Sequence, residues 1–167
     1  MKRTEFVKLC AKTLREKGFT GRNDNFFRKS DNGVILTVWL HRSFFDNHYY
    51  IEFAYSFSEL NNRPLSPKYN EADVRCGKIR FEFPRAMTEI HYYETTPEDF
   101  LPMLSEHLDE IISAADEGRD TIVKKYVDVK PCSKAILSSE RVVDFLGVRG
   151  CKHIRLAQRG KAAGKPL

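Results

Sequence analysis

The side chains that could do chemistry are spread along the chain without the spacing of a catalytic motif. Histidines and one Cys-Lys-His run could supply acid–base or thiol chemistry, but none has a partner at diagnostic spacing; they are His41, His48, His91, His107 and Cys151-Lys152-His153. The four cysteines match neither a zinc nor a redox spacing and indicate free thiols; they are Cys10, Cys76, Cys132 and Cys151. The sequence therefore predicts no catalytic residue, no metal site and no cofactor.

One short match to a nuclease motif is present. Asp128 and Lys130 form the acid-x-Lys half of a metal-dependent nuclease site. Such a site needs further carboxylates to hold magnesium. Asp116, Glu117 and Asp120 lie upstream, around an expected helix end rather than on a paired strand. Because three-residue matches arise by chance in most chains, we place a metal-dependent nuclease third among the functions and favour a protein without enzymatic activity.

Length and charge indicate one domain followed by a basic tail. A chain of 167 residues with 41% hydrophobic residues can bury one core. Six of the 28 basic residues and none of the 23 acidic ones lie from Arg149 onward, so the rest of the chain is nearly neutral despite a net charge of +5. We expect an α+β domain over 1–148 and a flexible tail over 149–167. No apolar run approaches the ~18 residues of a membrane span, and no signal-like start is present, so we expect a cytoplasmic protein without a membrane partner.

Hydrophobic periodicity and turn residues predict the elements. We expect an α+β fold with an N-terminal helix, a four-stranded antiparallel sheet, a long helix and shorter C-terminal helices. Thr96 and Pro97 form a helix start, although Pro102 predicts a kink or a late start. The expected strands cover residues 25–31, 34–40, 49–57 and 74–83, and the expected helices cover 4–17, 97–117, 120–126 and 139–146.

The Asn-Gly pair at residues 32–33 predicts how the first two strands are joined. Asn-Gly readily adopts the positive φ angles of a type I′ turn, whose twist matches that of the flanking strands. With a two-residue loop, counting outward places Phe27 opposite Val38 and Phe26 opposite Trp39. These pairs lie on opposite faces of the sheet. We therefore expect Phe26 and Trp39 to share a face.

Four segments resemble one bacterial family. They are Leu14–Phe19, Asn25–Arg28, Tyr50–Phe53 and Cys76–Phe81, and together they are similar to the domain-of-unknown-function family DUF4304 over about the first half of the chain. The resemblance implies a helix ending in Gly-Phe, followed by an antiparallel sheet packed against further helices. The sequence departs from the family pattern at residues 82–84. Since the family has no established activity, the resemblance supports the fold and leaves the function open.

The second face of the expected sheet and the loop over residues 41–48 form a candidate partner surface. Aromatic residues and arginine are enriched at interaction hot spots and also stack on nucleic-acid bases. The candidate residues are Phe26, Arg28, Trp39, His41, Phe44, Phe45, Tyr50, Glu52 and Arg80. Alternatively, a C-terminal helix covers this face and makes it a second core, because large aromatic side chains are usually buried.

Three functions follow from these features. The first is a non-enzymatic interaction module that binds an unidentified protein partner, in a toxin-immunity or defence-associated accessory role by analogy. The second is a nucleic-acid-binding accessory protein, in which sheet-face arginines and aromatics act with the basic tail residues Arg149, Lys152, Arg155, Arg159 and Lys161. The third is the nuclease. Homo-oligomer formation stays open.

Overall fold

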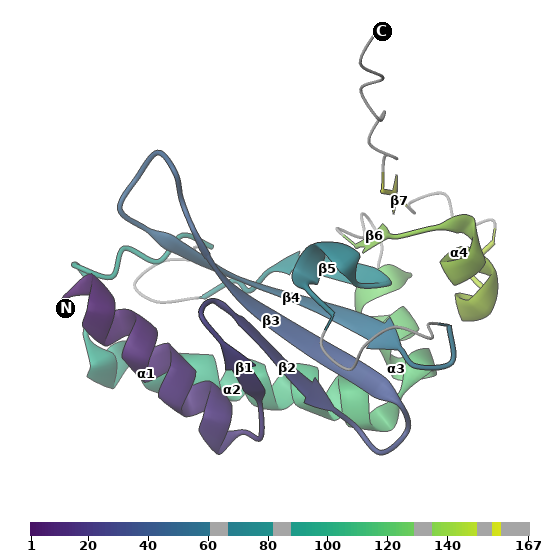
Figure 1. The fold of residues 1–167 in the computed structure, drawn as a ribbon, viewed down its shortest axis with the longest axis horizontal. Coiled ribbons are helices and arrows are strands. Elements are labelled where there is room, and N and C mark those ends of the chain that lie inside the picture. Colours follow the sequence, from purple (N-terminus) through teal and green to yellow (C-terminus); the bar gives the residue numbers. More distant parts are fainter. Residues whose placement is uncertain (61–66, 82–87, 129–134, 150–154, 158–167) are drawn as a thin grey trace, which may run out of the picture.

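The strands form one sheet in sequence order. The computed structural model describes residues 1–60, 67–81, 88–128, 135–149 and 155–157. Within this part the sheet has seven strands in the order β1 to β7, antiparallel except for the parallel pair β6 and β7 (Figure 1). The strands are β1 (Thr20–Arg22), β2 (Asn25–Lys29), β3 (Val34–Arg42), β4 (Tyr49–Phe57), β5 (Val74–Lys78), β6 (Ile136–Leu137) and β7 (Arg155–Leu156).

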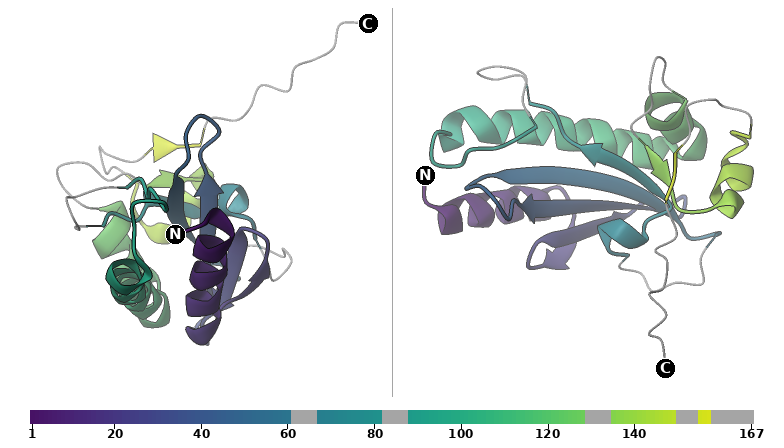
Figure 2. Two further views of the ribbon diagram at one scale, coloured as in Figure 1. Left: turned by 90° about the vertical axis from the view of Figure 1, so that its left-hand side faces the viewer. Right: turned by 90° about the horizontal axis from the view of Figure 1, so that it is seen from above.

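The helices lie mostly on one side of the sheet. The N-terminal helix α1 (Arg3–Glu16) and the long helix α2 (Pro97–Glu117) lie side by side along that face (Figures 1 and 2). The shorter elements are η1 (Tyr69–Glu71), α3 (Arg119–Ile122), the π-helix η2 (Val123–Val127) and α4 (Glu140–Leu146). The α+β class, the N-terminal helix and the long helix are therefore as predicted.

Helix α2 begins where its sequence indicates. The Thr96 hydroxyl accepts a hydrogen bond from the Asp99 amide at 3.3 Å, and Pro97 occupies the first helical position. The predicted late start at Pro102 is therefore wrong, because the helix includes this proline near its N-terminus. The apolar stripe of the helix is buried over its whole length; it consists of Phe100, Leu104, Leu108, Ile111 and Ala115.

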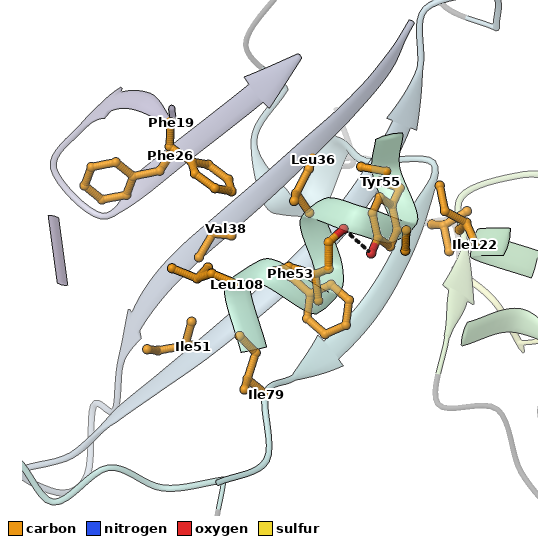
Figure 3. Packing of buried hydrophobic residues seen from close by; sticks show 14 of the residues in the cluster. Phe19, Phe26, Leu36, Val38, Ile51, Phe53, Tyr55, Ile79, Leu108 and Ile122 are labelled. Atoms are coloured by element: carbon orange, nitrogen blue, oxygen red, sulfur yellow. Dashed lines mark hydrogen bonds between the residues drawn. The ribbon is translucent and has the colours of Figure 1, made fainter. Parts of the chain in front are cut away.

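The core lies between this helical layer and the facing side chains of β2, β3, β4 and β5. Leu36 and Val38 on β3 project toward Leu108 of α2 (Figure 3). The hydroxyl of Tyr55, which is fully buried on β4, donates a hydrogen bond to the Ile111 carbonyl at 3.1 Å. This bond satisfies the polar end of a large buried side chain and joins the sheet to α2.

The predicted register of β2 against β3 is wrong by one residue. Phe26 pairs with Val38, not with Trp39. The reason is that Ser30 lies opposite Val34, which leaves three residues, 31–33, in the loop between them. The Ser30 amide donates to the Val34 carbonyl across this loop at 2.8 Å, and only Gly33 within it has a positive φ, +84°. A shift of one residue moves every side chain of a strand to the other face. Phe26 is consequently 1% exposed and belongs to the core.

The predicted number of strands is also wrong. β1, β6 and β7 contain only two or three residues each, too few to show a period-two pattern in the sequence. The fourth predicted strand ends as β5 at Lys78, after a register irregularity opposite Phe53 and Ala54, and residues 79 and 80 are not part of a strand. Gly77, with φ +91°, lies at this irregularity. Residues 82 and 83 lie outside the described part.

Candidate functional site

The second face of the sheet is covered at one end and open at the other. At the covered end, the buried Thr37 hydroxyl donates to the Pro67 carbonyl at 3.3 Å, and Ile35 and Ser56 are buried beside it. Pro67, which is buried here, comes shortly before η1 in the sequence. At the open end Trp39 is half-buried. The face is therefore neither a fully open surface nor the helix-covered second core of the alternative prediction.

Aromatic rings run across the open end in one continuous row. Trp39 contacts Tyr69 of η1, with ring centroids 5.6 Å apart, and stacks on His41, with centroids 4.1 Å apart. His41 in turn contacts Tyr50 on β4 at 5.7 Å and Phe44 beyond the end of β3 at 6.5 Å. We call Tyr69, Trp39, His41, Tyr50 and Phe44 the aromatic row. It connects η1 to the tip of the hairpin formed by β3 and β4.

The carboxylate of Glu52, which is largely buried, lies next to the aromatic row. Glu52 pairs with Trp39 across the strands and is 9% exposed. Its Oε2 lies 3.5 Å from Nδ1 of His41. Burial raises the pKa of Glu52, and the charges of His41 and Lys78 oppose this only in part. The Lys78 ammonium lies 3.2 Å from the centre of the Tyr50 ring, a cation–π contact.

The hairpin tip exposes two adjacent phenylalanines. Phe44 is 92% and Phe45 is 95% exposed, the largest exposed fractions among the large apolar side chains that the structure describes. The Ser43 hydroxyl accepts hydrogen bonds from the amides of Phe45 and Asp46 at 3.3 and 3.2 Å, and the Ser43 amide donates to the His48 carbonyl at 3.0 Å. The loop is thus held by its own hydrogen bonds. The tip projects beyond the helices and the rest of the sheet (Figure 1).

Three of the predicted surface residues lie elsewhere. Phe26 is in the core, as the corrected register requires. Arg28 lies on the helix side of the sheet, where its guanidinium donates two hydrogen bonds to the Asp116 carboxylate at 2.7 and 3.0 Å. Arg80 is exposed beyond the end of β5. The structure therefore brings together Trp39, His41, Phe44, Phe45, Tyr50 and Glu52, and separates Phe26 and Arg28 from them.

The predicted basic tail is described only in part. Arg149 pairs with Asp144 of α4, with Nη2 and Oδ2 2.7 Å apart. Arg155 is exposed in β7, which pairs with β6 in parallel. The remaining predicted tail residues, Lys152, Arg159 and Lys161, lie outside the described part.

The other chemically active side chains have packing partners. His107 meets the Phe81 ring edge-on at 5.3 Å, and Nε2 of His48 lies 2.8 Å from the Tyr50 hydroxyl. Cys10 is buried, which raises the pKa of its thiol. Asp128 follows η2, and Lys130 is outside the described residues. Within the described ranges, no three His, Cys, Asp or Glu side chains lie close enough together to hold a metal ion.

Sequence reasoning missed two contributors to this surface. Tyr69 comes from the irregular connection between β4 and β5, where no periodicity predicts a ring above Trp39. Lys78 has the outward position of its strand, but its place over Tyr50 depends on the pairing of β4 with β5. An outward lysine next to an outward tyrosine on neighbouring strands would have been a usable indication, had the register been known.

The fold and surface define an α+β domain with a half-covered antiparallel sheet and an exposed aromatic hairpin. The model of a protein family described as a domain of unknown function (DUF4304) matches residues 10–117 of the chain. The chain belongs to this family, as the resemblance in its sequence predicted. The match runs from α1 to the end of α2 and includes the aromatic row.

Other comparisons and the hydropathy of the helices add two findings. No curated protein and no solved structure matches the chain significantly. Among the helices that the structure describes, none combines the length and the apolar character that crossing a membrane requires.

Proposed function

We propose that this domain is a non-enzymatic interaction module that binds a partner protein through the tip of the β3–β4 hairpin and the adjoining aromatic row. The observation that carries the proposal is the pair Phe44 and Phe45, which are almost fully exposed at the end of a hydrogen-bonded loop. Exposed apolar groups on a loop whose backbone is held by hydrogen bonds favour interaction, because less backbone entropy remains to be lost on binding.

The size of the aromatic surface supports a specific contact. A phenylalanine side chain buries ~150–250 Å² when it is enclosed, and burial contributes about 25 cal/mol per Å². Complete enclosure of Phe44 and Phe45 therefore contributes about 4–6 kcal/mol per ring before the costs of association, within the range of a strong hot spot. The partner needs an apolar socket for these two rings. Tyr50 and the half-buried Trp39 lie along the continuation of the row.

Charged residues near the aromatic row would influence which partner is bound. Arg42 and Asp46 are exposed next to the two phenylalanines in the sequence, and the exposed Lys78 lies over Tyr50. Interfaces commonly place such charges at a rim, where they favour partners of complementary charge and add little affinity. The proposal thus describes a partner with an apolar socket and a polar margin. A toxin-neutralising or defence-associated role would use the same surface, with the toxin or defence protein supplying the socket.

Nucleic-acid binding has less support from the geometry. Arg28 was predicted to act beside Trp39, but its guanidinium is paired with Asp116 on the opposite side of the sheet. Arg149 is paired with Asp144. Contact of either guanidinium with a phosphate would require its ion pair to open.

The test is co-purification of the tagged full-length chain from the cells in which it occurs. We expect a protein partner in stoichiometric amount, which is lost when both phenylalanines are changed, Phe44→Ser and Phe45→Ser. Tyr93→Ser is the matched control, because Tyr93 is a large aromatic residue that is 53% exposed outside the row. Retention of the partner by the double variant, or recovery of nucleic acid in its place, contradicts the proposal. Since both side chains are exposed, the melting temperature should stay unchanged.

A further inference from the structure

A cavity of about 630 Å³ opens between the β1–β2 turn and η1. Its volume lies within the range of small-molecule sites, about 300–1,000 Å³. Three aromatic side chains line it together with three asparagines; they are Phe27, Trp39, Tyr69, Asn23, Asn25 and Asn70. Asp24 and Lys68, both exposed, also line it. The cavity is separate from the hairpin tip and shares with the aromatic row only Trp39 and Tyr69.

Both walls of the cavity are fixed by the fold. On one side, Gly21 lets β1 approach β2 closely, since a Cβ at this position would lie 2.3 Å from the Asn25 carbonyl oxygen. Asn23 takes the left-handed conformation, φ 58°, in the turn between these strands. On the other side, the Thr37 hydroxyl donates a hydrogen bond to the carbonyl of Pro67. Pro67 lies two residues before the start of η1, so this bond holds η1 against the sheet. A cavity held in this way loses little entropy on binding a ligand.

The chemistry of the walls favours a ligand with a flat ring and a polar edge. The carboxamides of Asn23, Asn25 and Asn70 each offer donors and an acceptor to a ligand, and Asn23 and Asn70 are exposed. Asp24 and Lys68 carry opposite charges, so the charges of the described lining residues balance. Aromatic rings stack on nucleobases, and asparagine pairs with the N6 and N7 edge of adenine.

We propose that this cavity binds a purine nucleoside, with the base against the aromatic wall and its polar edge toward the asparagine side chains. The Trp39 and Tyr69 rings contact each other, with centroids 5.6 Å apart and planes inclined by 33°, so the base lies beside them rather than between them. His41 stacks on Trp39, which leaves the rest of the indole to line the cavity. Lys68 is the cation that would meet a phosphate, so AMP gains over adenosine only a weak, salt-dependent contribution.

Titration of the tryptophan fluorescence with adenosine tests the proposal, because Trp39 is the single tryptophan and lines the cavity. We expect a saturable change with a Kd below about 1 mM, confirmed by calorimetry. Asn25→Ala and Asn70→Ala should each weaken binding by about fivefold, the equivalent of one net hydrogen bond. Asn70 is exposed on a short helical turn, so its variant keeps the fold intact and can be checked by circular dichroism.

Two controls separate this site from the hairpin tip. Tyr93→Ala and the double variant Phe44→Ser with Phe45→Ser should bind adenosine as the unchanged protein does, since neither changes a residue of the cavity. Three results would overturn the proposal: no saturable change up to about 10 mM adenosine, equal affinity in the folded asparagine variants, or saturation by a neutral sugar such as maltose in place of adenosine. Loss of the protein partner in the hairpin variant with retained adenosine binding would show that the two sites are independent.

Discussion

The imidazole of His41 lies flat on the indole of Trp39, with ring centroids 4.1 Å apart and planes inclined by 5°. The two residues are two positions apart on β3, so their side chains share the partly open face of the sheet. This stack connects the cavity beside η1 to the exposed hairpin tip. It also gives the only tryptophan of the chain a defined neighbour on one side.

Removing the imidazole should change the fluorescence of Trp39. In His41→Ala we expect a higher quantum yield and stronger quenching by acrylamide, because the ring that covers one face of the indole is gone. The unchanged protein should show intermediate quenching, since Trp39 is half-buried. Phe44→Ser serves as control, because Phe44 contacts His41 and not the indole. Equal quenching in His41→Ala and the parent would show that the two rings do not stack in solution.

Replacing the buried carboxylate should change how stability depends on pH. Burial raises the pKa of Glu52 above its ordinary value of 4.5, so the folded protein binds the proton more readily than the unfolded chain. The contribution of Glu52 to stability is therefore complete below that ordinary value and is lost as pH rises through the higher folded pKa. In urea denaturation, Glu52→Gln should remove this loss and raise the free energy of unfolding at pH 7 by up to about 1 kcal/mol.

The opposite pH dependence is expected for Asp116. Hydrogen bonds from Arg28, and then from Ser30, lower the pKa of this carboxyl below its ordinary 3.8. Its contribution to stability is present above the ordinary pKa and is lost as pH falls through the lower folded pKa. We expect Asp116→Ala to reduce the free energy of unfolding at pH 7 by about 1 kcal/mol, a modest value because the pair is partly exposed. A larger loss at pH 3 than at pH 7 would contradict this assignment.

The three-residue turn between β2 and β3 can be tested with a pair of glycine variants. Gly33 has φ +84°, and a Cβ there would lie 2.4 Å from the Ser58 hydroxyl oxygen, whereas Gly77 has φ +91° and no atom within 4 Å of a Cβ. Gly33→Ala therefore also forces the Ser58 hydroxyl to rotate away, in addition to the backbone cost of about 1–2 kcal/mol that both variants share. Thermal unfolding should show the lower melting temperature for Gly33→Ala, and the reverse order would count against the turn described here.

The regular elements could be predicted from the sequence because their patterns repeat over many residues. The stripe from Phe100 to Ala115 and the alternation from Tyr49 to Phe57 each repeat often enough to define a face. The exposed pair Phe44 and Phe45 could also be identified, since two adjacent apolar residues in a polar loop have no strand or helix partner.

The candidate surface could not be predicted fully because it depends on one loop residue and on tertiary contacts. The sequence at 32–33 suits a two-residue turn, but Asn32 donates through its side chain to the Ala115 and Asp116 carbonyls of α2, at 2.9 and 3.0 Å. That contact stabilises a three-residue loop. The resulting register places the Phe26 side chain on the face of the sheet that packs into the core. Likewise, Tyr69 and Trp39 are far apart in the sequence, and their contact arises only in the folded chain.

Photo-cross-linking from the hairpin tip tests the proposed function most directly. A benzophenone amino acid at position 45, in the full-length chain inside the cells in which it occurs, would place the reactive group on a side chain that is 95% exposed. We predict one dominant cross-linked protein, whose yield falls when Phe44→Ser is added and which is absent when the same group replaces Tyr93. Equal yields at positions 45 and 93, or no cross-linked protein at position 45 in the folded domain, would contradict a binding role for the hairpin.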